Sequence, residues 1–360
     1  MAQSTLVIGA GIIGSAMAWQ LAESGCTVTL VDPSDTGGAA SGMSLGWTNA
    51  TYENPRFYYE LRRFSMERWD ALKATYPDLP YRQNGTLYTS FYGTPLQTVY
   101  DEHTPWGYPM TWVSAAQMAE LEPHLAVRPE RGLVCPVEGH VAPHEAAIFF
   151  RGLALGAGAQ FKKTRALSVL REGDKIIGVR TENENLLADT TVLAAGRHAD
   201  TLARTVDVEL PMTAPPGLLI HTKPAPSLIN RTILTEDLHM AQWPDGTITA
   251  GGDFGGGAVN DDPDTGAQIL FERLQKALSN GAALQYSHHT VGLRPTPQDG
   301  FPVIGSPLQG LYLTVMHSGA TLAPAVGALA TDEITTGQRH ALLDPFHPNR
   351  FANTWNVECV

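Results

Sequence analysis

Short apolar runs and glycine-rich turns alternate near the start of the chain. Residues 5–8 (TLVI) form a β-branched apolar run that is typical of a buried parallel strand. The sequence GAGIIG follows at 9–14, and a stretch of helical character covers 15–24. A second apolar run over 27–31 ends on Asp32. This order predicts a strand, a tight turn, a helix and a second strand packed as one parallel unit.

Apolar periodicity and turn residues predict the elements of the remaining chain. They are helices over 56–74, 143–156, 266–280 and 321–336, a hairpin over 166–180, buried strands over 190–194 and 311–315, and short antiparallel strands over 217–250. We expect Pro324 in the first turn of the last helix, where a missing N–H costs least. Segments of different texture around 80–140 and 210–290 interrupt the core pattern, which favours two discontinuous domains.

Composition excludes several classes of protein. The 360 residues suffice for about two domains, and 43% hydrophobic with 17% charged residues excludes a disordered chain and a coiled coil. The net charge of −12 argues against nucleic acid or an anionic membrane surface as the main partner. The first residues lack the pattern of a secretory signal peptide, so we expect none, and no apolar stretch approaches the ~20 residues of a membrane span. We therefore expect a cytoplasmic protein without a transmembrane segment.

Cysteine and histidine spacing argues against metal binding. The three cysteines, at positions 26, 135 and 359, are far apart and include no CxxC pair, which disfavours a disulfide framework and a cysteine zinc site. His140 and His144 have the spacing of two ligands on one helix face, but a proline lies between them and no third ligand is evident. We therefore predict no metal site.

The glycines near the N-terminus have the pattern of a dinucleotide site. Gly9 permits the tight turn, Gly11 lets the backbone approach a pyrophosphate, and Gly14 lets the helix pack closely on the strand. The helix N-terminus offers unpaired N–H groups to phosphate, and Asp32 can accept the hydroxyls of a ribose. The motif alone does not separate FAD from NAD.

Five segments together carry a resemblance to a known family. They are GAGIIG at 9–14 with Asp32, GGAASG at 37–42 with LGW at 45–47, TVLAAG at 191–196, GLRPTPQDGFPVIG at 292–305, and HSGATLAPAVG at 317–327. In this order they resemble the glycine oxidase/D-amino-acid oxidase/sarcosine oxidase family of FAD-dependent amine oxidoreductases. The stretches that begin at 292 and 317 are the most specific.

The resemblance implies FAD as the cofactor. Enzymes of the sarcosine oxidase type attach the flavin through a cysteine near the segment after the arginine motif, and residues 294–315 contain no cysteine, so we expect FAD to be bound non-covalently. The implied FAD contacts are Gly9, Gly11, Ile12, Ile13, Gly14, Asp32, Pro33, Ala40, Ser41, Leu45, Gly46, Trp47, Ala166, Ala195, Gly196, Arg294, His317, Ser318, Gly319, Ala320, Thr321 and Leu322.

The same resemblance implies a substrate site. Arg294 is expected to face the flavin and to bind a substrate carboxylate through two parallel hydrogen bonds; the alternative is an ion pair with a nearby acid. His239, Trp47 and Tyr52 are further candidates, with a place in the core or in an ordinary strand as the alternative. His317 and His239 stand where glycine oxidases tend to have a basic and an aromatic residue, which leaves the amine specificity open.

The start of the last predicted helix is a candidate for stabilising negative charge on the reduced flavin. Backbone N–H groups of residues 319–321, with the hydroxyls of Ser318 and Thr321, would act like an oxyanion hole. Ordinary helix capping is the alternative, and one set of groups could serve both purposes.

The predicted fold class is α/β, with a Rossmann-like FAD-binding domain and an interleaved α+β substrate domain built on an antiparallel sheet. The expected FAD-binding segments are 1–80, 141–212 and 288–360. The expected substrate-domain segments are 81–140 and 213–287.

The resemblance implies oxidation of the C–N bond of an amino acid or secondary amine that carries a carboxylate. A hydride would pass to flavin N5, the imine would hydrolyse, and reoxidation by O₂ would give hydrogen peroxide. The alternatives are a dehydrogenase of the same fold that passes electrons to a quinone or partner subunit, a flavin-binding module without turnover, and an NAD-dependent dehydrogenase. An N-methyl amino acid, a cyclic imino acid, a D-amino acid and an opine all stay open as substrates. A homo-oligomer and a subunit of a larger complex stay open as assemblies.

Overall fold

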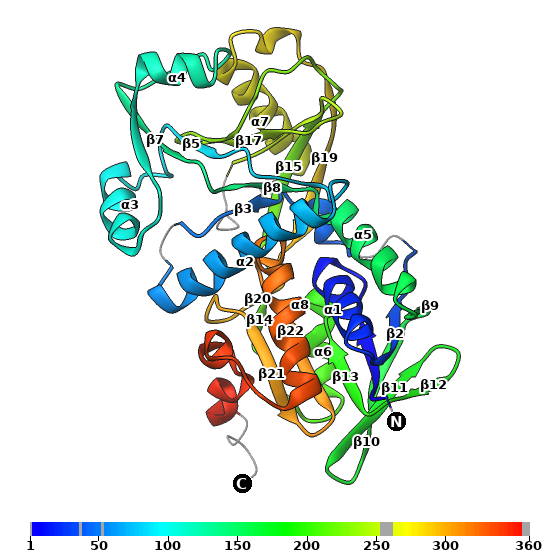
Figure 1. The fold of residues 1–360 in the computed structure, drawn as a ribbon. Helices are drawn as coiled ribbons and strands as arrows, with labels where there is room; N and C mark the ends of the chain where they lie inside the picture. Colours follow the sequence, from blue (N-terminus) through cyan, green and yellow to red (C-terminus); the bar gives the residue numbers. More distant parts are fainter. Residues whose placement is uncertain (1, 36–37, 52–53, 253–261, 355–360) are drawn as a thin grey trace.

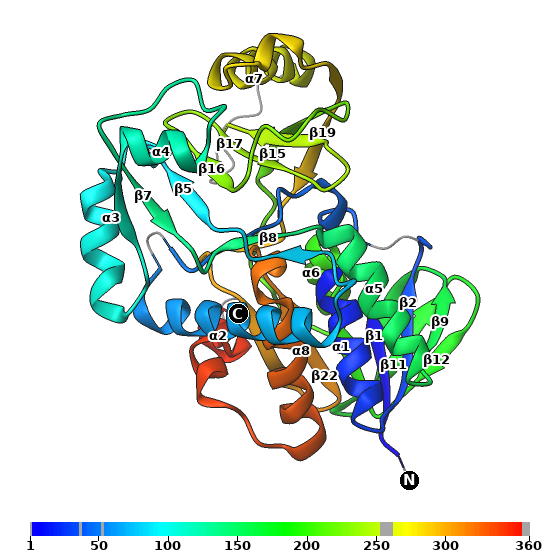
Figure 2. The ribbon, with the colours of Figure 1, turned by 45° about the horizontal axis from the view of Figure 1, so that its top comes forward.

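The computed structural model describes residues 2–35, 38–51, 54–252 and 262–354. Figure 1 shows a lower part that contains both ends of the chain and an upper part built from the middle of the sequence. In the two views of Figures 1 and 2, the long helix α2 (Arg56–Thr75) crosses the molecule between these parts. No helix in the described ranges is long and apolar enough to cross a membrane.

The lower part is organised around a mostly parallel sheet. In the described chain its six strands have the order β21-β22-β13-β1-β2-β9. Their bounds are β1 Ser4–Ile8, β2 Thr27–Asp32, β9 Gln160–Lys163, β13 Thr190–Leu193, β21 Val303–Leu308 and β22 Leu311–Val315. All neighbours are parallel except β21 and β22. Strands from distant segments thus form one buried layer, as a Rossmann-like fold requires.

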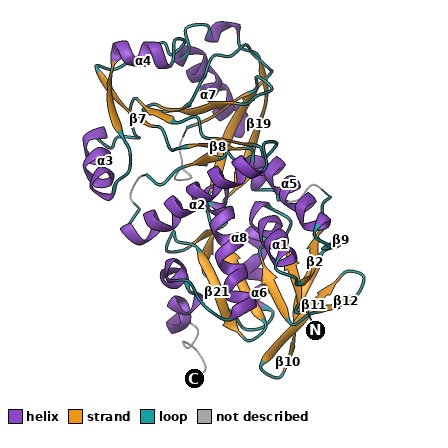
Figure 3. Ribbon diagram, in the orientation of Figure 1, coloured by secondary structure: helices purple, strands orange, loops and turns teal. Residues whose placement is uncertain are grey.

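Three helices cover one face of this sheet (Figure 3). Helix α1 (Ile12–Glu23) packs on α5 (Pro143–Gly156) and α8 (Gly319–Thr336), and α8 packs in turn on α2. A smaller sheet of β10 (Ala166–Glu172), β11 (Lys175–Thr181) and β12 (Asn185–Leu187), with helix α6 (Ala199–Arg204), packs through a second apolar cluster. The predicted strand–turn–helix–strand unit, the helices over 56–74 and 143–156, and the hairpin are confirmed.

The upper part contains a larger sheet. Within the described residues its order is β19-β15-β18-β17-β16-β5-β7-β6. The bounds are β5 Thr86–Tyr88, β6 Thr111–Ser114, β7 Arg131–Cys135, β15 Pro216–Thr222, β16 Thr232–Leu234, β17 His239–Gln242, β18 Ile248–Gly251 and β19 Tyr286–Leu293. The prediction of an antiparallel sheet is wrong for one pairing, because β5 runs parallel to β16. These two strands come from different segments of the chain, so no hairpin fixes their direction.

Shorter elements complete the upper part and the connections. They are α3 (Leu96–His103), α4 (Ala115–Leu121) and α7 (Pro263–Ala277), with β3 (Trp47–Thr48), β4 (Tyr81–Arg82) and β8 (Gly139–Val141) in one small sheet and β14 (Met212–Thr213) with β20 (Thr296–Pro297) in another. Helix α7 begins before the predicted 266, because Asp262 caps its N-terminus and Pro263 occupies the first position. The domain boundaries given above remain an interpretation.

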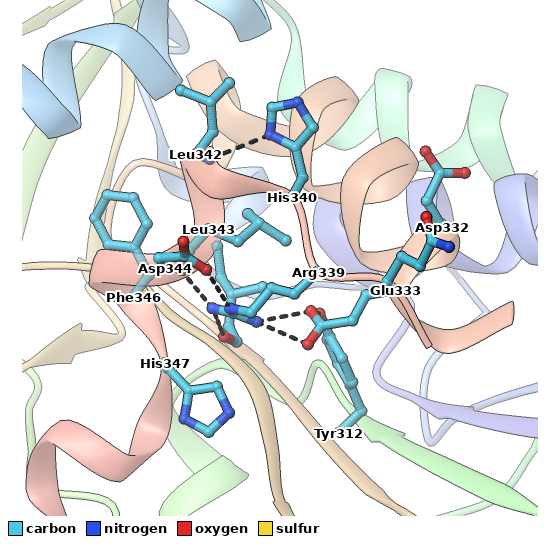
Figure 4. Close-up of polar contacts among 12 residues, drawn as sticks. Tyr312, Asp332, Glu333, Arg339, His340, Leu342, Leu343, Asp344, Phe346 and His347 are labelled. Carbon is cyan, nitrogen blue, oxygen red and sulfur yellow. Dashed lines mark hydrogen bonds and ion pairs between the residues drawn. The ribbon is translucent and has the colours of Figure 1, made fainter. Parts of the chain in front are cut away.

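The C-terminal end of α8 is held by an ionic cluster (Figure 4). Arg339 Nη1 donates to both carboxylate oxygens of Glu333, at 2.9 and 2.7 Å, and the Tyr312 hydroxyl donates to the same carboxylate at 2.6 Å. Arg339 Nε lies 3.3 Å from a carboxylate oxygen of Asp344. The cluster therefore ties α8 to strand β22 and to the segment that follows the helix.

Pro324 lies inside α8, so the expectation that it occupies the first turn is wrong. The helix begins at Gly319, earlier than predicted, and a proline at its sixth position leaves the Ala320 carbonyl without its usual donor. Trp69 of α2 supplies a replacement, because its Nε1–H lies 3.1 Å from the carbonyl oxygens of both Ala320 and Thr321. The Ser65 hydroxyl donates to Thr321 O at 2.7 Å and accepts from the Ala325 N–H at 3.2 Å. Side chains of helix α2 thus form hydrogen bonds with the backbone groups of α8 around the proline.

Replacing Trp69 by phenylalanine should lower the free energy of unfolding by about 1–3 kcal/mol, since it leaves a buried carbonyl without its donor. A urea titration of wild type, Trp69→Phe, Pro324→Ala and the double variant measures the coupling. In the Pro324→Ala background residue 324 can donate to the Ala320 carbonyl, so the cost of losing the indole N–H should shrink by about 1 kcal/mol. Equal costs in both backgrounds would contradict this role of the indole.

Candidate active site

The glycine-rich turn after β1 is shaped by close backbone contacts. Gly9 has φ 105°, and a Cβ there would lie 2.5 Å from the Ala194 carbonyl oxygen. A Cβ on Gly14 would lie 1.8 Å from the Gly9 carbonyl oxygen, so helix α1 approaches the turn more closely than any side chain permits. At Gly11 the nearest atoms to such a Cβ are Ser41 Oγ at 3.4 Å and Gly38 Cα at 3.5 Å. The turn therefore brings the segment after β2 against the N-terminus of α1.

Asp32 at the end of β2 is buried and oriented by the backbone. Its two carboxylate oxygens each accept one N–H at 2.8 Å, from Ala10 and Ser34. The Ser41 hydroxyl accepts the Ile12 N–H at 3.2 Å, and the Asp32 carbonyl accepts the Thr164 N–H at 3.1 Å. Asp32 and Ser41 therefore stand next to the start of α1, as the dinucleotide prediction requires.

Other residues predicted to contact the cofactor lie around these strand ends. Ala195 and Gly196 follow β13, Ala166 opens β10, and Pro33 follows β2. The predicted loop contacts are Ala40, Leu45 and Gly46; the Gly46 backbone pairs with Val141, whose N–H donates to the Gly46 carbonyl at 2.9 Å. Tyr52, and Gly37 of the second family segment, lie outside the described residues.

The N-terminus of α8 meets the strand that contains Trp47. The Thr321 hydroxyl lies 3.3 Å from the Trp47 carbonyl, to which it donates, and 3.4 Å from the Asn49 N–H, which it accepts. The single hydroxyl proton of Thr321 is therefore donated within the protein. Of the two donors of Thr321 in the predicted oxyanion hole, the hydroxyl is excluded and the backbone N–H stays a candidate. The Gly319 N–H donates to the His317 carbonyl at 2.9 Å. Side chains of Ile12 and Ile13 approach Gly319, which places the starts of α1 and α8 side by side. Leu322 is fully buried behind them.

Arg62 of α2 contacts the N-terminus of α8 through Ser318. Arg62 was not among the site residues predicted from the sequence. Only 6% of the residue is exposed. Its Nε donates to the Asn49 carbonyl at 2.9 Å and its Nη1 to Ser318 Oγ at 2.7 Å and Tyr58 Oη at 3.1 Å, while Nη2 donates to Asn49 Oδ1. One signal existed in the sequence, because Arg62 falls on the apolar face of a predicted amphipathic helix, four residues after Tyr58.

Arg294 follows directly after β19 and lies over the neighbouring strand β15. Its backbone N–H donates to the Pro215 carbonyl at 3.1 Å, and Nη1 lies 3.5 Å from the Pro216 carbonyl. A Cβ on Gly217 would fall 2.5 Å from Nη2, so the absence of a side chain at 217 gives the guanidinium its place. Arg294 is half-buried.

His239 is the first residue of β17 and is 1% exposed. Its Nδ1 is 2.5 Å from the hydroxyl of Tyr92, a residue with φ 46° that sequence reasoning missed. Burial, helped by the charge of Arg294, lowers the pKa of His239 to about 3. His239 is therefore neutral at physiological pH and acts as a hydrogen-bonding group.

His317 lies between two arginines. Desolvation by the surrounding protein, with the charges of Arg294 and Arg62, lowers the pKa of His317 to about 4. The residue as a whole is nevertheless exposed, so solvent weakens both effects. The ring is thus neutral above pH 5. Arg294 and Arg62 supply permanent positive charge to the surroundings of His317.

Trp47 is tied to a buried acid. Its Nε1–H lies 2.9 Å from Thr86 Oγ1 and 3.2 Å from Glu138 Oε2. Glu138 is fully buried, and the hydroxyls of Tyr88 and Tyr108 donate to it at 2.7 and 2.6 Å. Burial raises the pKa of Glu138, against the opposing effect of these donors. Sequence reasoning missed this acid, since nothing in its local sequence marks it as a partner of Trp47.

His140 lies on β8 and not on a helix with His144, because α5 begins only at Pro143. Neither ring nitrogen of His140 has a hydrogen-bond partner in the described chain, and the ring packs edge-on against Trp243. Burial lowers the pKa of His140 to about 4. No group of three potential metal ligands is present among the described residues.

Replacing His140 by phenylalanine should make the protein less sensitive to acid. The unfolded chain protonates this histidine below about pH 6.5 while the folded protein keeps it neutral, so stability is lost as pH falls from 6.5 towards 4. The stability of the variant relative to wild type should therefore increase by about 2 kcal/mol between pH 7.5 and pH 5. Urea titrations at both pH values measure this. A difference that does not change with pH would contradict a neutral buried His140.

Comparison with known proteins decides the family. The model of the FAD dependent oxidoreductase family, DAO, matches residues 4–333. The chain belongs to this family. A glycine oxidase of Pseudomonas aeruginosa is 27% identical to this DAO-family chain over 374 residues, which cover 96% of the chain and 98% of that protein. A D-amino acid dehydrogenase of Paramagnetospirillum magneticum is 24% identical and covers 97% of this chain and 99% of its own length.

Solved structures agree on the fold of this DAO-family chain. A glycine oxidase from Bacillus cereus has a TM-score of 0.84 at 24% identity, with 96% of this chain and 98% of that chain covered. An L-amino acid deaminase from Proteus vulgaris, studied without its specific insertion, has a TM-score of 0.87 at 20% identity and covers 97% of this chain and 94% of that one. The α/β fold with a Rossmann-like domain and the FAD cofactor are thus confirmed, and the NAD alternative is excluded.

The residues of this DAO-family chain fit FAD by two observations of the structure. The turn at Gly9, Gly11 and Gly14 is free of side chains beside a helix N-terminus, which suits a pyrophosphate. The carboxylate of Asp32 is fixed nearby by backbone donors. The contacts named from the sequence stay a prediction residue by residue.

Proposed function

We propose that the protein oxidises the C–N bond of an amino acid or secondary amine that carries a carboxylate. The observation that supports this most is the position of Arg294, a half-buried guanidinium beside the neutral rings of His239 and His317. Because both imidazoles are neutral, the cationic group available to a carboxylate at this point is an arginine with a planar pair of donors.

The proposed mechanism assigns each group of this chain one task. Arg294 binds the carboxylate and fixes the direction of the substrate. His239, 1% exposed and held by the Tyr92 hydroxyl, is proposed to supply a buried neutral ring to the wall of the site. Trp47 and Tyr52 are proposed to line the same pocket. When bound, FAD would take up two electrons and a hydrogen from the substrate carbon and pass the electrons on to O₂, giving hydrogen peroxide. Water then hydrolyses the imine to a carbonyl compound and an amine or ammonia.

The residues proposed to hold FAD are those named from the sequence. Asp32 would accept the ribose hydroxyls, the turn at 9–14 and Ser41 would bind the pyrophosphate, and the start of α8 would face the flavin. We propose that the cofactor is not covalently attached, since residues 294–315 contain no cysteine and Cys135 is fully buried in β7. Acid precipitation should therefore leave the yellow colour in the supernatant.

A second electron acceptor has support from the relatives. One is named an oxidase and another a dehydrogenase, at similar identity to this chain. A dehydrogenase would pass its electrons to a quinone or a partner subunit. Comparing the peroxide formed per turnover with the rate for an artificial acceptor separates these functions, and we expect one peroxide per amine oxidised.

The decisive experiment is an anaerobic flavin-reduction screen. Purified holoprotein is mixed with N-methyl amino acids, cyclic imino acids, D-amino acids and opines, and the absorbance of oxidised flavin is followed. Members of one carboxylate-bearing class should bleach the flavin, whereas the matching amines without a carboxylate should do so far more slowly. Bleaching by none of them would instead favour a flavin-binding module without turnover.

A further inference from the structure

We propose that Arg62 is a positioning residue whose buried charge, acting through Ser318 at the N-terminus of α8, stabilises negative charge on the flavin. The inference rests on the proposed placement of the flavin at this helix end. It goes beyond the family's sequence motifs, because Arg62 lies in none of the five segments that carry the resemblance.

The partners of Arg62 are all neutral. The guanidinium donates to the carbonyl and side-chain oxygens of Asn49 and to the hydroxyls of Tyr58 and Ser318. Two other arginines of the same helix differ from it, because Arg56 pairs with Glu60 and Arg63 with Glu67. No ion pair of Arg62 with an acid is found in the described chain. A guanidinium buried to this degree without a countercharge is costly, so an anionic group is the expected complement.

The hydrogen bond to Ser318 connects the charge of Arg62 to the N-terminus of α8. Ser318 Oγ accepts from Arg62 Nη1 at 2.7 Å and lies 3.4 Å from His317 Nδ1. In the tautomer in which His317 Nδ1 carries the ring proton, the ring donates to Ser318 Oγ and the hydroxyl proton can point to a ligand. Ser318 also caps an 18-residue helix without using its side chain for the cap. A hydroxyl polarised by an arginine and a helix N-terminus therefore converge on one point, which suits a group that becomes negative on reduction.

The charge of Arg62 also acts on a second group, His317. Arg62 contributes, with Arg294, to the lowered pKa of His317. Arg62 and Arg294 thus act on the same region from different elements, one from α2 and one from the end of β19. Arg294 is half-buried and can touch a ligand, whereas Arg62 is enclosed and acts through its neighbours.

Arg62 also holds Asn49 in place, so the test must separate charge from scaffolding. Arg62→Gln removes the charge, and Arg62→Lys keeps it. Asn49→Asp keeps an oxygen for Arg62 Nη2 to donate to but places a countercharge beside it. Arg56→Gln removes an exposed charge from the same helix and serves as the matched control.

The readout is sulfite binding to the purified holoprotein, followed by the loss of flavin absorbance. Sulfite donates its electron pair to flavin N5 and forms an N–S bond, which leaves the negative charge on the flavin ring. The sulfite Kd should rise at least tenfold in Arg62→Gln and in Asn49→Asp, and stay within about threefold of wild type in Arg62→Lys and Arg56→Gln. If the equilibrium constant for two-electron reduction of the flavin also falls tenfold in these two variants, their flavin midpoint potential should be about 30 mV lower than that of wild type.

Two results would overturn the proposal. One is an unchanged sulfite Kd in Asn49→Asp, a variant that tests the charge even if Arg62→Gln fails to retain FAD. The other is an equal loss in Arg62→Lys and Arg62→Gln, which would assign the effect to hydrogen bonding. Since sulfite needs no amine, failure of this test is distinguishable from failure of the proposed amine oxidation.

Discussion

Replacing Arg294 by methionine is expected to raise the KM for carboxylate-bearing amines about 30- to 150-fold. Methionine keeps much of the length and apolar contact of the arginine stem but removes the charged donors, whose hydrogen bonds to a carboxylate contribute about 2–3 kcal/mol. Steady-state kinetics on the substrate identified by the flavin-reduction screen gives the value. The FAD content of the variant, read from its absorbance ratio, shows whether the cofactor site has survived.

The specificity of this effect is tested with a second substrate and a second variant. An amine that lacks the carboxylate should lose little or nothing in Arg294→Met, because it never used the guanidinium. Arg294→Lys should fall between wild type and methionine, since it keeps a charge but loses the paired donors. Equal losses for both amines would mean that Arg294 supports the fold and does not bind the carboxylate.

Replacing Gly14 by alanine is expected to abolish FAD retention. The new Cβ would lie 1.8 Å from the Gly9 carbonyl oxygen and 3.2 Å from Ala194 Cβ, so the turn and helix α1 must move apart. Such overpacking costs about 1–3 kcal/mol of stability, and it displaces the backbone proposed to face the pyrophosphate. We expect purified Gly14→Ala to hold less than about a tenth of the wild-type FAD, measured by the ratio of flavin to protein absorbance.

Gly152→Ala provides a matched control. Gly152 lies within helix α5, and a Cβ there would meet no atom within 4 Å. Alanine should therefore leave FAD retention unchanged and raise stability by up to about 1 kcal/mol, as expected for a glycine in a helix. If Gly14→Ala retained as much FAD as Gly152→Ala, the close approach at Gly14 would not be needed for the cofactor.

The local sequence determines the parts of this fold that could be predicted. The turn at 9–14 requires glycine at positions 9 and 14, and the apolar periodicity of α2 is strong, so these elements were predicted close to their observed bounds. Pro324 shows the limit, because its position inside α8 is tolerated only through Trp69 and Ser65, about 255 positions away in the sequence. The position of Pro324 in the helix therefore depends on tertiary contacts and not on the local sequence.

The same limit applies to the candidate site. His239 and Tyr92 are 147 positions apart, and the hydrogen bond between them depends on how α3 and the large sheet are joined. Arg62 carried a weak signal, a charge on an apolar helix face, but its neutral partners come from α2 itself, the β3 segment and the start of α8. Long-range pairings of this kind have no local pattern, so sequence reasoning could name Arg294 and His239 but not the groups that position them.

The anchoring of Trp47 by Glu138 restricts how the two parts of the molecule can move. The strand with Trp47 is bonded to α8 through Thr321 and to the upper part through the acid, so a rotation about this connection would expose a buried carboxylate and break several hydrogen bonds at once. Substrate entry by a hinge at residues 47–51 is therefore disfavoured. We therefore expect the amine to enter and leave by a path that keeps these hydrogen bonds intact.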